Sequence, residues 1–459
     1  METNRFATHS LNDARVLRIL SAALEAVEPG TVVRRHLSDH PLIIDGRVFG
    51  LGIGKAAVPM LQALAGLYPL EDGLAVTKHT PSPPPAPPLS STNGEGSSVW
   101  GTVMEGGHPI PDERSLAAGG RVLEFVARPK ADDLLVCLIS GGGSALVSAP
   151  HEGLSLKDMQ GLTSTLLSCG ARIDEINTLR RHLDRVKGGG LLRVVTEARV
   201  VSLILSDVVG NTLEAIASGP TAPDPSTRAE ALAILKKYQL EAVVPASILH
   251  TIRSAPETLK PDDPVFARVQ NVIVGDNLLA AQAAQRRAEQ EGFAAEILTS
   301  TLQGEAREAG YDLAGQLRTA SVSRAHPFCL IAGGEPTVTL APLASPHRHF
   351  EKNTSRVQGG DGGKGGRNQE LALAAVAGLA GLENVMLVSL ATDGEDGPTD
   401  AAGAVVTGES AHRAESLGLD AAAHLSRNDA YPFFDALGDL LKPGYTGTNV
   451  NDLVLLIAT

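Results

Sequence analysis

The sequence predicts an α/β protein with two domains. Its 459 residues exceed what one hydrophobic core usually organises. Short apolar runs that end in glycine alternate with amphipathic stretches, which is typical of strand–helix–strand units and a mostly parallel sheet. Glycine (48 residues) and proline (28) are frequent while aromatic residues make up only 3%, so we expect close helix packing and many tight turns.

The composition disfavours several classes of function. A net charge of −13 argues against binding to nucleic acid or to an anionic membrane surface. No apolar stretch has the length of a membrane span or a signal sequence, so we expect a cytoplasmic protein. Cys137, Cys169 and Cys329 are far apart in apolar or small-residue surroundings, which indicates core packing rather than redox or zinc chemistry.

The first half of the chain predicts one series of strands and helices. Expected elements are strands at Arg47–Gly52, Leu74–Thr77, Leu134–Ile139 and Val200–Leu205, a helix after Gly54, and helices at Ser115–Val126 and Ile173–Leu192. The Pro- and Ser-rich segment Pro81–Ser98 predicts a surface loop. Ser254–Pro264 predicts the connection to the second half, so we expect domains at 8–250 and 265–459.

The second half predicts another α/β series. Expected elements are strands at Val269–Val274, Glu296–Thr299, Phe328–Ala332, Val385–Ala391 and Leu453–Ile457, with helices at Asp276–Gln290 and Asn368–Leu379. The polar, glycine-rich insertion at 342–365 predicts a long loop.

The first glycine turn, Gly50-Leu51-Gly52-Ile53-Gly54-Lys55, lies between a strand and a helix. Backbone N–H groups at a helix start attract anions, although glycines there can also serve packing alone. Lys55 in the first turn would oppose the helix dipole by about 0.3–1 kcal/mol, which favours an anionic ligand. A Walker A motif is excluded, because Phe49 and Ala56 stand where it needs Gly and Ser or Thr. The second strand ends at Lys78-His79 rather than at an acidic residue, which disfavours NAD and leaves NADP open.

The second glycine turn directly follows the apolar strand Leu134–Ile139 and reads Ser140-Gly141-Gly142-Gly143-Ser144. Its backbone can wrap closely round a ligand, and the two hydroxyls can donate to phosphate oxygens. We therefore favour a phosphate or nucleotide site over a flexible hairpin. Asp207 follows the next strand, where α/β enzymes place ligand groups, and it could hold Mg²⁺, accept a hydroxyl proton or simply form a turn.

Four polar loops of the second half also lie at predicted strand or helix ends. They contain Glu335, Arg367-Asn368, Asp393 and Asn451. Each alone is explained by turn chemistry, but their recurrence predicts one crevice. In contrast, His108 is interpreted as a structural residue, and the absence of a suitably placed Gly-x-Ser-x-Gly turn argues against a Ser-His-Asp hydrolase.

Taken in order, these segments resemble the class II glycerate kinases, the glycerate 2-kinase or MOFRL family. The matching pieces are Gly52–Ala57, Gly106–Asp112, Ile139–Leu146, Ile176–Gly190, Leu205–Asp224, Gly333–Thr337, Gly365–Leu371, Ala391–Gly397 and Thr446–Leu456. The resemblance implies a larger Rossmann-like N-terminal α/β/α domain, a smaller C-terminal α/β domain and an active site in the cleft between them. It implies ATP-dependent phosphorylation of D-glycerate, usually giving 2-phosphoglycerate and ADP.

By this resemblance, Lys55 and Arg367 are the principal catalytic cations and Asp207 is a third catalytic residue. The same comparison implies a substrate or nucleotide site formed by Gly54, Ser140, Gly141, Gly142, Gly143, Ser144, Glu335, Asn368, Asp393 and Asn451. Mg²⁺ is expected to bridge ATP and one carboxylate, Asp207 or Asp393.

Two other functions stay open at this point. One is an NAD(P)H-dependent hydroxypyruvate reductase, and the other is a non-catalytic sensor of a nucleotide or sugar phosphate. The sequence does not decide between the 2- and the 3-phosphate product, since the two hydroxyl groups of glycerate differ by a small shift in the bound pose. A homodimer is possible.

Overall fold

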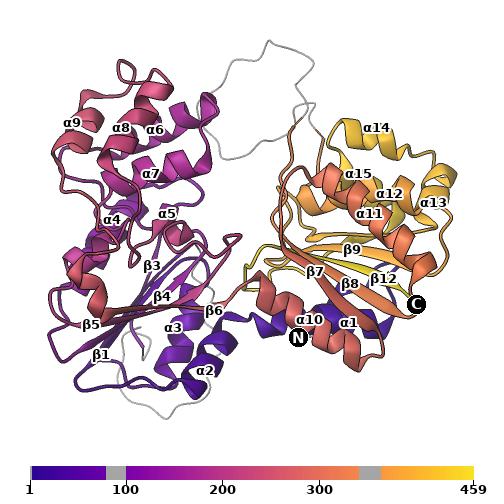
Figure 1. Cartoon of the computed structure of the whole chain (residues 1–459), viewed down its shortest axis with the longest axis horizontal. Helices are drawn as coiled ribbons and strands as arrows, with labels where there is room; N and C mark the ends of the chain where they lie inside the picture. The colour runs from indigo at the N-terminus through magenta and orange to yellow at the C-terminus, as the bar shows by residue number, and fades with distance from the viewer. Residues whose placement is uncertain (1–2, 79–99, 341–362) are drawn as a thin grey trace, which may run out of the picture. The chain divides into compact units, whose positions relative to one another are not determined.

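The computed structural model describes residues 3–78, 100–340 and 363–459 (Figure 1). The predicted loop at 81–98 and residues 342–362 of the predicted insertion lie outside these ranges. The chain divides into two compact units, Glu28–Asp276 and a second unit made of Met1–Val27 with Asn277–Thr459. In the described residues, the helices are all too short or too polar to cross a membrane.

The unit Glu28–Asp276 contains a six-stranded sheet in the order β3-β2-β1-β4-β5-β6, with every neighbouring pair parallel. This is the strand order of the Rossmann fold, so the expected Rossmann-like domain is confirmed. The strands are β1 (Val48–Ile53), β2 (Asp72–Thr77), β3 (Thr102–Glu105), β4 (Leu134–Ser140), β5 (Arg199–Leu205) and β6 (Val269–Gly275).

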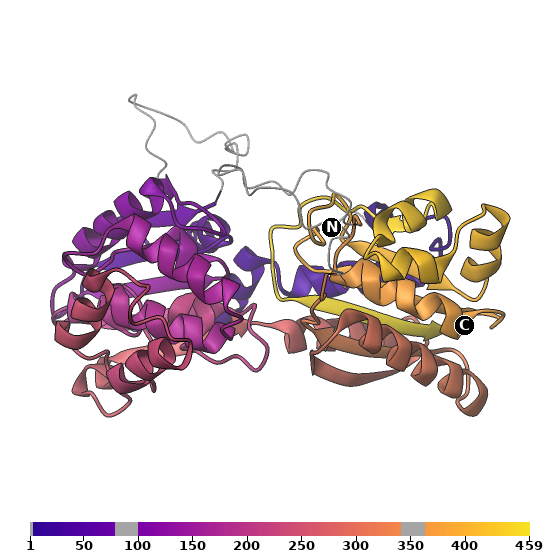
Figure 2. The same cartoon turned by 90° about the horizontal axis from the view of Figure 1, so that it is seen from above.

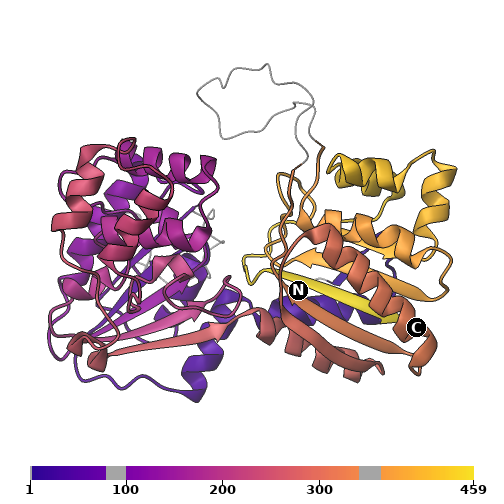
Figure 3. The same ribbon diagram turned by 45° about the horizontal axis from the view of Figure 1, so that its top comes forward.

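Helices complete this unit. They are α2 (Pro29–Asp39), α3 (Ala57–Ala65), α4 (Glu113–Val126), α5 (Gly143–Leu146), α6 (Leu156–Ser168), α7 (Ile173–Leu183), α8 (Arg228–Lys237) and α9 (Ala246–Ser254), with the short 3-10 helices η2 (Gly190–Arg193), η3 (Ile216–Ser218) and η4 (Pro264–Arg268). Helices α6 to α9 group round their own apolar cluster, apart from the core of the sheet (Figures 1 and 3).

The glycines of β1 are required by packing. Phe49, Leu51 and Ile53 alternate along the strand and belong to the buried core that α4 covers. Gly50 and Gly52 face α3, where an added Cβ would lie 2.4 Å from a methyl group of Leu61 and 2.9 Å from the carbonyl oxygen of Ala57. The packing interpretation of this glycine turn therefore accounts for its first two glycines.

The predicted helix at 173–192 is shorter than expected, since α7 ends at Leu183. The buried Asp184 carboxylate stops it by accepting hydrogen bonds from the backbone N–H groups of Ala149 and Val186. Its ion pair with Lys187 at 2.7 Å holds the chain in a turn instead of a further helical turn.

The second unit contains a mixed sheet in the order β11-β10-β9-β12-β8-β7. The pair β7–β8 is parallel, and the other neighbours are antiparallel, which differs from the mostly parallel arrangement that the sequence predicted. The strands are β7 (Ala294–Leu302), β8 (Phe328–Gly334), β9 (Val385–Ala391), β10 (Gly403–Thr407), β11 (Leu440–Leu441) and β12 (Asp452–Ala458).

Helices cover both faces of this sheet. They are α1 (Ala14–Ala26), α10 (Asn277–Gln290), α11 (Ala306–Ser323), α12 (Arg367–Leu379), α13 (Ser410–Ser416), α14 (Ala421–Ser426) and α15 (Ala430–Leu437), and η1 (Thr3–Phe6) precedes them. Helices α1 and α10 pack side by side on one face, while α11 and α12 pair on the other (Figures 1 and 2).

The observed units differ from the expected ranges 8–250 and 265–459. The first sheet belongs to Glu28–Asp276, and the other unit begins at Asn277 and also includes Met1–Val27. Strand β6 was assigned to the second half, but it pairs with β5 and completes the first sheet. The segment Met1–Val27 belongs to the second unit, where α1 packs on α10 and Arg18 forms an ion pair with Glu291 at 2.5 Å. The sequence alone does not tell on which sheet an amphipathic helix packs, because either apolar face would bury it equally well.

Candidate functional site

The first part of the candidate site lies at the edge of the first sheet where the strand order reverses. Strands β1 and β4 are parallel neighbours, with β2 on one side and β5 on the other. The connections that follow β1 and β4 therefore diverge to opposite sides of this point, where α/β sheets bind their ligands. Both predicted glycine turns lie here.

Hydrogen bonds connect these two turns. The Lys55 N–H donates to the Gly141 carbonyl at 2.9 Å, and the Ala56 N–H donates to Ser140 Oγ at 3.0 Å. Gly54 has φ +127°, and a Cβ there would lie 2.3 Å from Ser140 Oγ. Gly54 and the buried Ser140 thus join the two turns, and their contact with a ligand stays a prediction.

Lys55 lies just before α3 rather than in its first turn, because the helix begins at Ala57 with Ala56 as its N-cap. Its carbonyl accepts a hydrogen bond from Thr77 Oγ1, so its backbone is fixed on both sides. The side chain is half-buried, and within 3–78, 100–340 and 363–459 its ammonium has no ion-pair partner. A lysine whose backbone is fixed and whose ammonium lacks a counter-ion there is suited to binding an anionic ligand.

Side chains from three other loops surround the second glycine turn. A Cβ on Gly141 would lie 1.8 Å from Asp207 Oδ2. A Cβ on Gly142, which has φ +83°, would lie 3.1 Å from His108 Cδ2 and 3.3 Å from Lys55 Cγ. The structure therefore brings Lys55, Asp207 and His108 together round the turn, and we call these residues with Gly141–Ser144 the switch-point cluster.

Sequence reasoning gave His108 a structural role, but its ring lies over the glycine turn. Burial, followed by the charges of Lys55 and Lys78, lowers the pKa of His108 to about 4. The imidazole is therefore uncharged at neutral pH and can exchange hydrogen bonds with a ligand. Its position after β3, beside two other strand ends, was the signal that could have identified it.

Ser218 is a second residue that the sequence did not single out. Its Oγ lies 2.8 Å from Ser144 Oγ. Ala217 and Ser218 have φ +49° and +60°, a left-handed conformation that costs non-glycine residues of order 1 kcal/mol each. The fold holds this strained turn against Gly143, where an added Cβ would lie 2.8 Å from the Cβ of Ala217.

The second part of the candidate site lies in the other unit, at one edge of its sheet. Because β12 is antiparallel to both of its neighbours, its first residue, Asp452, pairs with Gly334 at the end of β8 and with Ala391 at the end of β9. The loops that carry Glu335, Asp393 and Asn451 consequently meet at this edge. Within this unit the structure brings these polar loops together, and the crevice that they were expected to form stays a prediction.

Arg367 is held there by two carboxylates. Its Nε and Nη2 donate to Asp452 at 2.6 and 3.1 Å, and its Nη1 donates to Glu335 at 2.8 Å. Burial alone would lower the pKa of Arg367, but Asp452 and Glu335 outweigh it and raise the pKa above its ordinary value. Burial raises the pKa of Asp452 to about 7, against the opposing effect of Arg367. In the sequence, Asp452 stands just before the predicted strand Leu453–Ile457 and was not singled out, whereas the structure makes it the first residue of β12.

The start of α12 is occupied by a carboxylate of the protein itself. The buried Asp396 accepts hydrogen bonds from the backbone N–H groups of Asn368 and Gln369 at 3.1 and 2.9 Å. Asn368 is fully buried, and its amide bonds Asp396 and Ser389. The first turn of α12 is thus compensated by a carboxylate of the protein, and Asn368 supports the helix start.

The remaining predicted residues line the same edge. Asp393 is half-buried, and its Oδ1 accepts the Glu395 N–H at 3.2 Å. Asn451 is buried with φ +68°, and its carbonyl accepts hydrogen bonds from both the N–H and the hydroxyl of Thr392. Glu335 is partly exposed. Their contact with a ligand stays a prediction.

Mg²⁺ takes oxygen ligands, so the acidic residues decide where it could bind. In the described part of the chain, no group of three or more His, Cys, Asp or Glu side chains could hold a metal ion. Mg²⁺ bound with a nucleotide usually takes only one or two carboxylates, the other ligands being phosphate oxygens and water. The single carboxylates Asp207 and Asp393 fit that requirement.

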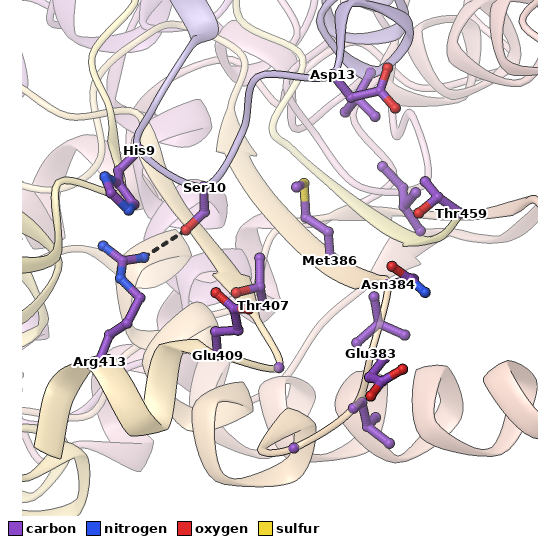
Figure 4. A pocket seen from close by; sticks show the side chains of 16 residues that line it. His9, Ser10, Asp13, Glu383, Asn384, Met386, Thr407, Glu409, Arg413 and Thr459 are labelled. Atoms are coloured by element: carbon purple, nitrogen blue, oxygen red, sulfur yellow. Dashed lines mark hydrogen bonds between the residues drawn. The ribbon is translucent and has the colours of Figure 1, made fainter. Parts of the chain in front are cut away.

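A pocket of about 650 Å³ lies at the opposite edge of the second sheet, where Thr407 pairs with Met386 (Figure 4). On one side of it, Arg413 donates to Ser10 Oγ and Asp439 Oδ2, both at 2.7 Å, which fastens the N-terminal segment. None of the predicted site residues is among the side chains that line this pocket in the described structure.

Comparison with protein families gives two matches along the chain. Residues 15–253 match the domain of unknown function DUF4147, and residues 328–452 match the MOFRL family.

Individual relatives match nearly the whole chain. The glycerate 2-kinase of Pyrococcus horikoshii is 39% identical, with 96% of each chain covered. A relative from Agrobacterium vitis, provisionally named a hydroxypyruvate reductase, is 35% identical over 98% of this chain and 95% of its own. The crystal structure of glycerate kinase from Thermotoga maritima superposes with a TM-score of 0.82 at 38% identity, covering 96% of this chain and 98% of the other. The chain therefore belongs to the glycerate kinase family that combines these two regions.

Proposed function

We propose that the protein transfers the γ-phosphoryl group of ATP to D-glycerate, giving 2-phosphoglycerate and ADP. The observation that carries this proposal is the switch-point cluster, in which a fixed lysine with no counter-ion among the described residues lies beside a glycine turn at the strand-order reversal. The name glycerate 2-kinase of the Pyrococcus horikoshii relative, and the name D-glycerate 2-kinase of a Thermotoga maritima relative, support the same reaction and the same hydroxyl group.

Lys55 and Arg367 are the two cations proposed to bind anionic groups of the substrates. Phosphoryl transfer needs cations that neutralise the charge developing on the transferred group, and it needs little covalent chemistry from the protein. Lys55 offers its whole charge, since it has no ion-pair partner in the described residues. Arg367 offers the planar guanidinium that recognises carboxylates and phosphates.

The bond changes assign a role to Asp207. The 2-hydroxyl oxygen of D-glycerate forms a bond to the γ-phosphorus while the bond to the bridging oxygen of ADP breaks, and the hydroxyl proton leaves. We propose that the Asp207 carboxylate, which packs against Gly141, accepts this proton. The uncharged imidazole of His108 is proposed to orient the acceptor by a hydrogen bond.

Mg²⁺ is proposed to bind with ATP, where it supplies additional positive charge at the phosphates. Asp393 is the carboxylate proposed to hold it, and Asp207 is the alternative. Substitution of the true ligand by Asn should raise the Mg²⁺ concentration needed for half-maximal activity, while the other variant should keep the normal requirement.

A cytoplasmic location and a homodimer stay predictions, which cell fractionation and analytical ultracentrifugation test.

Hydroxypyruvate reduction is the second candidate because of the name of the Agrobacterium vitis relative. The strand that would carry the ribose-binding carboxylate argues against it, since β2 ends at Thr77 and is followed by Lys78. A coupled assay for ADP with D-glycerate, run beside NADH and NADPH oxidation with hydroxypyruvate, separates the two. Binding of nucleotide without either turnover would indicate the sensor instead.

A further inference from the structure

The two carboxylates that hold Arg367 differ sharply in how firmly they are placed. Asp452 is buried at 3% side-chain exposure, and it receives two of the three guanidinium bonds. Its backbone is fixed on both sides by β8 and β9, and its carbonyl accepts a hydrogen bond from Asn277 Nδ2 at 2.8 Å. The backbone of Asp452 is thus fixed in the centre of the sheet, and its side chain is buried beside Arg367.

Glu335 is placed differently. It lies in the loop after β8, its side chain is 41% exposed, and it receives a single bond from Arg367, at Nη1. Its backbone N–H is anchored on the Leu302 carbonyl at 2.7 Å, so the side chain can rotate into solvent without moving the strand. A partly exposed ion pair of this kind is worth at most about 1 kcal/mol, so a ligand can exchange it.

We propose that Asp452 is the fixed anchor of Arg367, and that Glu335 is an exchangeable counter-ion on the Nη1 group that binds an anionic group of a substrate. This inference rests on the proposed function only in taking D-glycerate and ATP as the ligands. Both ligands have a suitable anionic group, since a carboxylate and a phosphate can each accept the hydrogen bond that Arg367 Nη1 donates to Glu335 in this structure.

The consequence is that Glu335 competes with the substrate. Each binding event must break the bond between Glu335 and Arg367 Nη1, and the displaced carboxylate stays near the incoming anion. Substitution by glutamine removes the charge and keeps the length of the side chain, so it should strengthen ligand binding. Asp452, by contrast, sets the direction of the guanidinium, so its substitution should weaken binding.

Isothermal titration calorimetry of D-glycerate and of ATP, each titrated separately into the full chain, tests this without relying on turnover. Glu335→Gln is expected to lower the Kd of one of the two ligands about three- to fivefold, and the ligand affected identifies the group that Nη1 binds. Glu395→Gln is the matched control, because it removes the same charge from an exposed residue at the same sheet edge, and it should change neither Kd comparably.

An unchanged or raised Kd for both ligands in Glu335→Gln would overturn the proposal, as would an equal gain in Glu395→Gln. Asp452→Asn should raise the Kd of the affected ligand. Because Asp452 is buried, that variant can also misfold, so the test of the proposal rests on the variant of the partly exposed Glu335. If D-glycerate binds with the predicted shift and is not phosphorylated, the proposed reaction fails and the exchange stands. If it is phosphorylated without the shift, the exchange fails alone. Binding of neither compound refutes both.

Discussion

Removing the Asp396 carboxylate should destabilise the unit that contains Arg367. Asp396 is 1% exposed, and it accepts hydrogen bonds from the Asn368 N–H at 3.1 Å, the Gln369 N–H at 2.9 Å and Gln369 Nε2 at 3.0 Å. In Asp396→Ala the two backbone donors lose their partner inside the protein, while Gln369 Nε2 keeps its hydrogen bond to Thr399 Oγ1 at 2.9 Å. Each buried donor without a partner costs about 1–3 kcal/mol.

The burial of the carboxylate opposes part of this loss. Burial raises the pKa of Asp396, so ionised Asp396 is itself costly to keep in the interior. Combining the two effects, we expect Asp396→Ala to lower the free energy of unfolding by about 3 kcal/mol. Asp420→Ala is the matched control, because Asp420 accepts two backbone N–H groups at the start of α14 while exposed to solvent, and its loss should cost about 1 kcal/mol.

The assay is urea-induced unfolding followed by circular dichroism, together with hydrogen exchange at the first amides of α12. The Asp396 variant should unfold at clearly lower urea than the Asp420 variant, with faster exchange at the amides of residues 368 and 369. If both variants lose the same stability, Asp396 is no more than an ordinary helix cap.

Three further changes test the switch-point cluster. Lys55→Ala should lower kcat about 100- to 1,000-fold with little change in Tm, and normal turnover would remove Lys55 from the mechanism. Gly141→Ala should displace Asp207, since the added Cβ would lie 1.8 Å from Oδ2, and it should lower both the activity and the free energy of unfolding, the latter by about 1–3 kcal/mol. Gly120→Ala is the control: a Cβ there, in α4, has nothing within 4 Å, so the variant should be as stable as the wild type or more stable. The lowered pKa of His108 means that its contribution to stability is present above about pH 6.5 and is lost as the pH falls toward 4, so Tm should fall less between pH 7 and 5 in His108→Gln than in the wild type. An equal fall in both would show that His108 titrates normally.

The strands were predictable because they are apolar and bounded by glycine or polar residues. Strand β9 has the predicted ends, Val385 and Ala391. The placement of site residues at strand ends followed from the same pattern, since polar loops after buried strands collect at one sheet edge. The local sequence therefore predicts the two sheet edges on which the candidate residues lie.

What the sequence did not yield depends on contacts between distant segments. Asp452 neutralises Arg367 from 85 residues away, and the local sequence round Arg367 does not reveal this partner. The roles of Gly50 and Gly52 depend on how closely α3 approaches the sheet, which a motif does not state. The assignment of β6 to a sheet depends on which strand it pairs with, and the predicted connection Ser254–Pro264 before it gave a wrong domain boundary.

Phosphorus NMR of the product tests the central claim most directly. The protein is incubated with ATP, Mg²⁺ and D-glycerate, and the spectrum is recorded as the nucleotide is consumed. The account predicts equal amounts of ADP and a phosphomonoester whose phosphorus couples to the single proton on carbon 2, as in 2-phosphoglycerate. A phosphorus coupled to the two protons of carbon 3 would contradict the proposed hydroxyl group, and the absence of any D-glycerate-dependent phosphomonoester would contradict the reaction itself.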